Sequence, residues 1–84
     1  MDRQQIVLAI LTKHIKLNVD GLEQTDISPE KSMVEYGASS LDIVEIVSAA
    51  MRELKIKIPR TELARIKNIG QLVDLFLAVE QQAV

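Results

Sequence analysis

Apolar residues recur at helical spacing in three stretches of the chain. Within residues 2–17, 40–54 and 69–79 the apolar positions fall three and four residues apart, which is the period of one face of an α-helix. The predicted apolar faces are Ile6, Val7, Ile10, Leu11, His14 and Leu17 in the first helix, Ile43, Ile46, Val47, Ala50 and Leu54 in the second, and Ile69, Leu72, Val73, Phe76 and Val79 in the third.

The residues that flank these stretches predict where each helix begins. Each helix follows a polar residue suited to N-capping, with a possible capping-box partner three positions later. These pairs are Asp2 with Gln5, Ser39 with Asp42, and Asn68 with Gln71. Asp42 would also complement the positive end of the helix dipole.

The connections between the three helices differ in length and character. Residues 18–38 form a long, mostly polar loop, and we expect its isolated apolar residues to pin it across the helices. Residues 55–59 alternate like a strand but have no partner strand, so an extended linker ending at Pro59 is expected. Residues 61–65 could form a short helix. The predicted fold is all-α: a small antiparallel bundle of three main helices plus one short helix, with a long loop between helices I and II.

Size and composition limit what this chain can contain. Its 84 residues predict a single domain, residues 1–84, and domains this small are only marginally stable unless the core is well packed. Apolar residues make up 48% of the chain, but Tyr36 and Phe76 are the only aromatic ones. The core must therefore be aliphatic, with little material left to surround an internal catalytic cavity.

The composition also narrows the location and the class of partner. The sequence has no cysteine, no apolar run of signal-peptide type and no membrane-length segment, so a cytoplasmic protein without membrane contact is expected. With 12 acidic and 10 basic residues the net charge is −2, which does not favour nucleic-acid binding. Nothing indicates oligomerisation, and we expect a monomer.

Catalytic and metal-binding groups are scarce. His14 is the single histidine and lies in an apolar helical face, where a packing role is the simpler interpretation. No ligand spacing for a metal is present, and the three glycines are isolated, so no phosphate-binding loop is formed. We therefore expect no catalytic residues and no metal site.

Ser40 is the exception, because it places a hydroxyl where the polar loop meets the second helix. Serine pairs before helices usually serve as caps, but Ser39 suffices for that role and leaves Ser40 for another use. Leu41 and Val44 lie beside it on the face predicted to point away from the core. Exposed apolar residues next to a hydroxyl indicate a docking surface. We interpret Ser40 as an attachment point, not as a catalytic nucleophile.

The run of residues 36–45, Tyr-Gly-Ala-Ser-Ser-Leu-Asp-Ile-Val-Glu, resembles the phosphopantetheine attachment motif of acyl carrier proteins. That motif reads Leu-Gly-x-Asp-Ser-Leu-Asp-x-Val-Glu. The similarity covers nearly the whole chain, because Ile58-Pro59 and Ile69-Gly70 also match family features. In combination these motifs are quite specific.

The resemblance implies a function for the site. Ser40 would receive 4′-phosphopantetheine from coenzyme A through a phosphopantetheinyl transferase, and the arm would hold acyl groups as thioesters. Asp42 would help to present the serine, while Leu41, Val44 and Glu45 would belong to the surface that partner enzymes grip. Arg60 and Arg65 belong to a basic stretch, residues 52–67, which is either a solvated face or a second part of that surface.

Several departures from the family pattern bear on the pathway. Ser39 stands where most members have aspartate, Tyr36 replaces a leucine, and Ser48 replaces an apolar residue. With the basic stretch, these differences argue against a housekeeping role in fatty acid biosynthesis.

The chain instead resembles discrete carriers of bacterial polyketide biosynthesis, the pathways that include antibiotic biosynthesis. Its partners would be an acyltransferase and either a ketosynthase or an HMG-CoA-synthase-like enzyme, which takes acetyl from a donor carrier during β-branching. An extending carrier is the rival subtype. An unmodified helical module that binds a partner through helix II is the alternative function.

Overall fold

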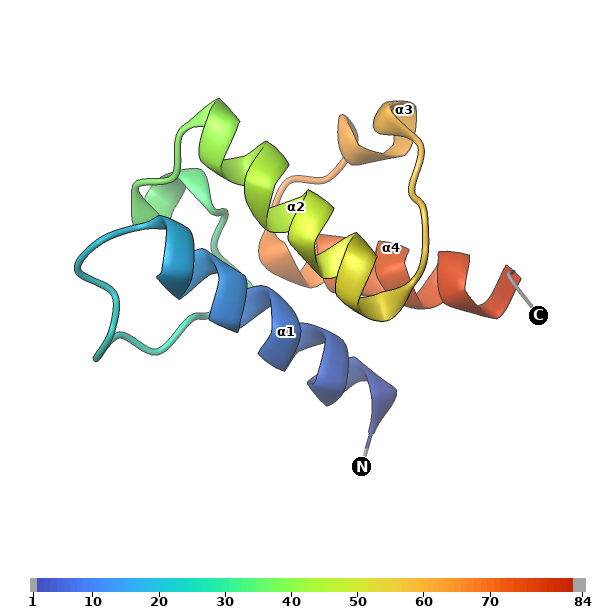
Figure 1. Ribbon diagram of the computed structural model, residues 1–84, viewed down its shortest axis with the longest axis horizontal. Coiled ribbons are helices and arrows are strands. Elements are labelled where there is room, and N and C mark those ends of the chain that lie inside the picture. Colours follow the sequence, from blue (N-terminus) through green and yellow to red (C-terminus); the bar gives the residue numbers. More distant parts are fainter. Residues whose placement is uncertain (1, 83–84) are drawn as a thin grey trace.

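The computed structural model describes residues 2–82, and these form four α-helices and one turn of 3-10 helix (Figure 1). The elements are α1 (Arg3–Asn18), η1 (Val34–Tyr36), α2 (Ser40–Leu54), α3 (Arg60–Leu63) and α4 (Ile69–Gln82). The prediction of an all-α bundle of three main helices and one short helix is confirmed. The second helix has the predicted bounds, whereas α3 begins and ends earlier than residues 61–65.

The three long helices bury one aliphatic core. α1 packs against both α2 and α4, and Figure 1 shows α1 and α2 running in opposite directions. Fully buried side chains from the three helices meet there, with Phe76 of α4 the largest of them. The other members with no measurable exposure are Val7, Leu11 and Ile15 of α1, Ile46 and Ala50 of α2, and Leu72 of α4.

The predicted apolar face of α1 is correct at its start and wrong at its end. Leu17 is 71% exposed, whereas Ile15, which was not assigned to this face, is completely buried. The buried residues Val7, Leu11 and Ile15 are spaced by four, so the contact follows the i, i+4 ridge along which crossing helices interlock. A ridge of that kind drifts around the helix, and by the last turn it has left the side on which Leu17 lies.

The long loop between α1 and α2 is anchored by its apolar residues, as predicted. Val19, Met33 and Ala38 are buried, and the loop ends in the η1 turn, which the sequence did not reveal. The side chain of Tyr36 links the end of this loop to its middle. Its hydroxyl accepts a hydrogen bond of 2.7 Å from the N–H of Ser28 and donates one of 3.4 Å to the carbonyl of Asp26.

The same loop is fastened to the beginning of α4. The N–H groups of Ile69 and Gly70 donate to the carbonyls of Lys31 and Pro29, at 3.0 and 2.8 Å. These are first-turn amides that no residue within α4 could satisfy. A side chain at position 70 would meet the loop, because a Cβ there would lie 3.2 Å from the Pro29 carbonyl oxygen. Gly70 therefore permits this close approach.

The predicted cap of α4 is confirmed. The Oδ1 of Asn68 accepts the N–H of Gln71 at 2.7 Å, and the Oε1 of Gln71 accepts the N–H of Lys67 at 2.7 Å. Asp2 caps α1 as predicted. Its carboxylate accepts the N–H of Gln4 and not that of Gln5, the partner expected from the sequence.

The far end of α2 turns sharply into the extended linker. Lys55 adopts the left-handed conformation with φ 59°, which non-glycine residues rarely do. The N–H groups of Lys55 and Ile56 both donate to the carbonyl of Met51. The linker predicted over residues 55–59 is therefore not extended at Lys55, whereas residues 56–59 lie outside any helix and Pro59 is extended. Ile56 and Ile58 are buried, so the linker packs against the core.

The hydrogen bonds of Tyr36 yield a prediction for the loop. Tyr36→Phe keeps the ring and its contact with Lys31, whose Nζ lies 5.7 Å from the ring centroid, but leaves the partly buried N–H of Ser28 without its acceptor. An unsatisfied donor of this kind costs about 1–2 kcal/mol. Urea unfolding followed by circular dichroism should show a loss of that size. An unchanged free energy of unfolding would mean that water replaces the hydroxyl.

Two carboxylates that bridge helices predict how stability depends on pH. Glu53 of α2 bonds Lys13 and Glu80 of α4 bonds Arg3, and these hydrogen bonds lower the pKa of each carboxyl below its ordinary 4.5. A lowered pKa in the folded state contributes stability above about pH 4.5, which is lost as the pH falls through the lowered value. Glu53→Gln with Glu80→Gln should therefore lower the Tm at pH 7 and make little difference at pH 3.

Glu23→Gln provides the control, because Glu23 is exposed and forms no ion pair within residues 2–82. Thermal unfolding by calorimetry at low ionic strength is the measurement, since salt screens exposed pairs. A Tm difference of equal size at both pH values would refute the assignment to these carboxylates.

Candidate functional site

The N-terminus of α2 is closed by a reciprocal pair of hydrogen bonds. The Oγ of Ser39 accepts the N–H of Asp42 at 3.2 Å, and the Oδ2 of Asp42 accepts the N–H of Ser39 at 2.9 Å. This is a complete capping box, which satisfies two amides that would otherwise lack partners. The sequence-based assignment of Ser39 as the cap is confirmed, and its hydroxyl is occupied.

Ser40 is the first residue of α2, and its hydroxyl is free. The residue is exposed, and no hydrogen bond engages its Oγ from within the part of the chain that the structure describes. The backbone N–H groups of Ser40 and Leu41 likewise have no acceptor among residues 2–82. An anion attached to the hydroxyl would meet these amides and the positive end of the helix dipole.

Exposed apolar side chains occur near Ser40 in the sequence, on the outer face of α2 and in the turn before it. Leu41 is 73% exposed and Val44 is 54% exposed, so both point away from the core as the sequence predicted. The structure adds Val34, which is 64% exposed in η1, the turn that leads into α2 (Figure 1). Sequence reasoning missed Val34. The sequence feature that could have identified Val34 is that it is a large apolar residue outside every predicted helical face.

Two carboxylates lie on the first turns of α2, and their surroundings differ. Asp42 is half-buried and one of its oxygens is held by the Ser39 amide, so its position relative to Ser40 is fixed by the capping box. Glu45 is exposed. The Asp42 carboxylate is thus held two residues from the free hydroxyl, and the exposed Glu45 lies one turn further along.

A groove separates α2 from α3. It has a volume of about 490 Å³, and its walls are mainly apolar side chains such as Val44, Leu63 and Ile66. Ser48 and Arg60 add polar groups to the lining. Arg65 lies in the turn that follows α3 and is exposed, but it does not line this groove. Arg60 therefore lines the same groove as Val44, whereas Arg65 lies outside this groove.

His14 lies far from Ser40 and cannot act as its base. Its Nε2 is 3.5 Å from the Oε1 of Glu53, near the C-terminal end of α2. Thirteen residues of helix separate Ser40 from Glu53, which is about 20 Å. The ring is mostly buried against α2, in the packing role expected from the sequence. No group of three metal-ligating side chains occurs among residues 2–82, and no helix described there is long and apolar enough to cross a bilayer.

Comparison with known proteins places the chain in a family. Residues 14–76 match the model of the phosphopantetheine attachment site. The chain is 36% identical to the polyketide biosynthesis acyl-carrier-protein AcpK of Bacillus subtilis (strain 168), over 99% of this chain and 100% of that protein. It is also similar to a chain in the crystal structure of the curacin biosynthetic pathway HMG synthase in complex with acetyl donor-ACP. That match has a TM-score of 0.81 and 40% identity, and covers 93% of this chain and 99% of the other.

Proposed function

Because this chain belongs to the acyl carrier proteins, whose family is defined by the phosphopantetheine attachment site, we propose that Ser40 is the residue that bears 4′-phosphopantetheine. The observation that carries this assignment is the division between two adjacent serines. The hydroxyl of Ser39 is used in the capping box, and that of Ser40 is exposed and free. The unpaired amides of Ser40 and Leu41 suit a phosphodiester at this position.

The prosthetic group supplies a thiol, and the chain holds acyl intermediates on it as thioesters for partner enzymes of polyketide biosynthesis. The protein's own part is to present the arm and to be recognised. We propose that residues 1–84 form one carrier domain without catalytic activity, working in the cytoplasm. The distance between His14 and Ser40 supports the absence of a serine-based reaction.

We further propose that partner enzymes grip the outer face of α2. Leu41 and Val44 provide exposed apolar area next to the attachment point, and Glu45 adds a charge. Asp42 is proposed to present Ser40 to the transferase through the fixed geometry of the capping box. Val34 extends the apolar area onto the preceding turn.

For the cargo, we propose that the chain donates acetyl to an HMG-CoA-synthase-like enzyme. The support is its 40% identity to a chain of the HMG synthase complex with acetyl donor-ACP, over nearly the full length. The basic residues Arg60 and Arg65 are exposed and form no ion pair within residues 2–82, so they are available to such a partner. An acyltransferase and a ketosynthase remain the other candidate partners.

The attachment site is tested by incubating the chain with coenzyme A and a broad-specificity phosphopantetheinyl transferase. Intact-protein mass spectrometry should show one added phosphopantetheine group on the wild type and none on Ser40→Ala. Ser39→Ala is the matched control, because it removes the cap at a cost of about 1 kcal/mol but leaves the second hydroxyl in place.

Ser39→Ala should still be modified at a temperature where it is folded. Modification at Ser39, or of neither serine, would contradict the assignment. The alternative function, an unmodified helical binding module, requires instead that Ser40→Ala is harmless while Leu41→Asp or Val44→Asp abolishes partner binding.

The donor role is tested by acetyl transfer from the loaded chain to an HMG-CoA-synthase-like enzyme. Reversing both Arg60 and Arg65 to Glu should slow the transfer several-fold if these cations meet acidic groups of the enzyme. The loss should be larger at low salt than at high salt, because salt screens charges at a wet interface. Equal rates before and after reversal would show that Arg60 and Arg65 are merely solvated.

A further inference from the structure

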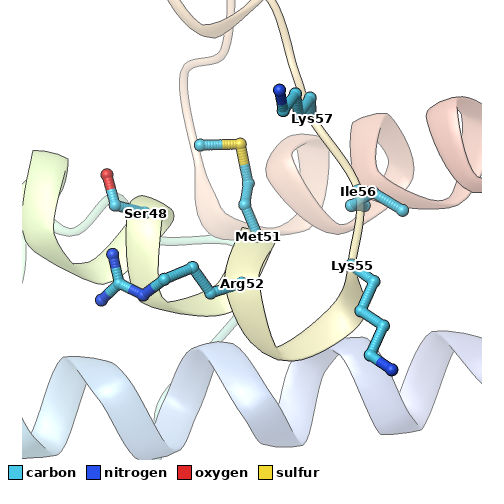
Figure 2. Close-up of a pocket in the computed structure, with 6 residues that line it drawn as sticks. All are labelled: Ser48, Met51, Arg52, Lys55, Ile56 and Lys57. Carbon is cyan, nitrogen blue, oxygen red and sulfur yellow. The ribbon is translucent and has the colours of Figure 1, made fainter.

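A second groove lies at the C-terminal end of α2, away from the attachment site. It has a volume of about 460 Å³ and is lined by Ser48, Met51, Arg52, Lys55, Ile56 and Lys57 (Figure 2). Ser40 and Arg52 are twelve helical residues apart, which is about 18 Å. Nothing in the carrier chemistry at Ser40 requires this groove.

The sharp end of α2 creates the groove. Because Lys55 is left-handed, the chain folds back and residues 55–57 pass alongside the last turns of the helix. The sulfur of Met51 accepts the N–H of Ile58 at 3.3 Å, which ties the exposed side of the helix to the linker. Figure 2 shows the Met51 thioether between Arg52 and Lys57, while the Lys55 side chain extends toward the opposite side.

The cations of this groove lack ion-pair partners in the described part of the chain. Arg52, Lys55 and Lys57 are exposed, and none forms an ion pair among residues 2–82. The nearest carboxylate in sequence, that of Glu53, is bonded to Lys13 of α1. Residues 52–67 contain six basic and two acidic side chains, a net charge of +4 in a chain whose total is −2. This positive charge is therefore concentrated and unneutralised.

We infer that this groove docks an acidic surface segment of the enzyme that receives the acyl group. In this complex an apolar side chain of the partner lies on Met51, and flanking carboxylates pair with Arg52 and Lys57. The inference rests on the proposed carrier function and adds Arg52 and Lys57 to the recognition surface. This groove shares Ser48 and Met51 with the groove between α2 and α3, which Val44 and Arg60 line.

The chemistry of the lining favours a protein segment over a phosphate-rich polyanion. A methionine at the centre of a cationic rim gains most by covering apolar surface, and its flexible thioether adapts to different side chains. An acidic peptide surface satisfies both the apolar centre and the charged rim.

The position of the groove determines which kinetic quantity it should affect. Contacts about 18 Å from Ser40 are the same before and during the chemical step, so they stabilise the complex without acting on the reacting atoms. Removing them should raise the KM for the loaded carrier and leave kcat unchanged.

The test uses the full-length loaded chain as the varied substrate, with an HMG-CoA-synthase-like enzyme and a ketosynthase as separate acceptors. Arg52→Glu with Lys57→Glu should raise the KM about tenfold at low salt for the acceptor that the carrier serves, because two like-charge contacts replace two attractive ones. The rise should shrink at high salt. Modification of Ser40 by the transferase should proceed at the wild-type rate, which also shows that the variant is folded.

Lys16→Glu with Lys31→Glu is the matched control, since it makes the same change in net charge on α1 and the loop. An equal KM rise in this control, or an unchanged KM in Arg52→Glu with Lys57→Glu, would overturn the docking groove while leaving the carrier function intact. A wild-type chain that is modified but transfers to neither acceptor would overturn the acceptor roles and the groove with them. A chain that is not modified at Ser40 would refute the attachment site itself.

Discussion

The capping box at the start of α2 is the interaction on which the site depends. A helix N-terminus needs acceptors for its first amides, and a lone serine in that position would use its own hydroxyl for the purpose. Here Ser39 and Asp42 satisfy each other's N–H groups, so the next hydroxyl is left outside the cap. Ser40 is consequently both rigidly placed and chemically free. Because the cap at position 39 is a serine and not an acid, Asp42 is the only charged member of this pair.

The rest of the fold holds that helix end in place. The loop before α2 is anchored by buried apolar residues and by the Tyr36 hydroxyl, and its carbonyls bind the first amides of α4. The two helix N-termini are therefore joined through one loop, with Gly70 allowing the contact. A domain of this size has little apolar surface beyond what its stability requires. Its chemistry is accordingly placed on the surface, on a tethered group, and not inside a cavity.

Sequence alone predicted the parts of this structure that depend on local signals. The bounds of α2, its cap, the exposed pair Leu41 and Val44, and the free serine all follow from helical period and capping chemistry. The errors concern tertiary geometry. Leu17 fits the helical period of the apolar face of α1 but is exposed, because the buried contact follows the i, i+4 ridge of Val7, Leu11 and Ile15. The η1 turn and the exposure of Val34 depend on how the loop packs, which no local period encodes.

The left-handed conformation of Lys55 is another feature that local sequence signals do not predict. It also explains why several basic side chains line one groove. A glycine at this position would have marked the turn in the sequence, but a lysine gives no such signal. The turn carries the chain back toward Met51, so Arg52 of α2 and Lys55 and Lys57 of the linker line one groove. α2 therefore has the proposed attachment point at its beginning and a concentrated positive surface at its end. This separation lets binding energy be gained at one end of the helix while the tethered group at the other end remains free to enter a partner's active site.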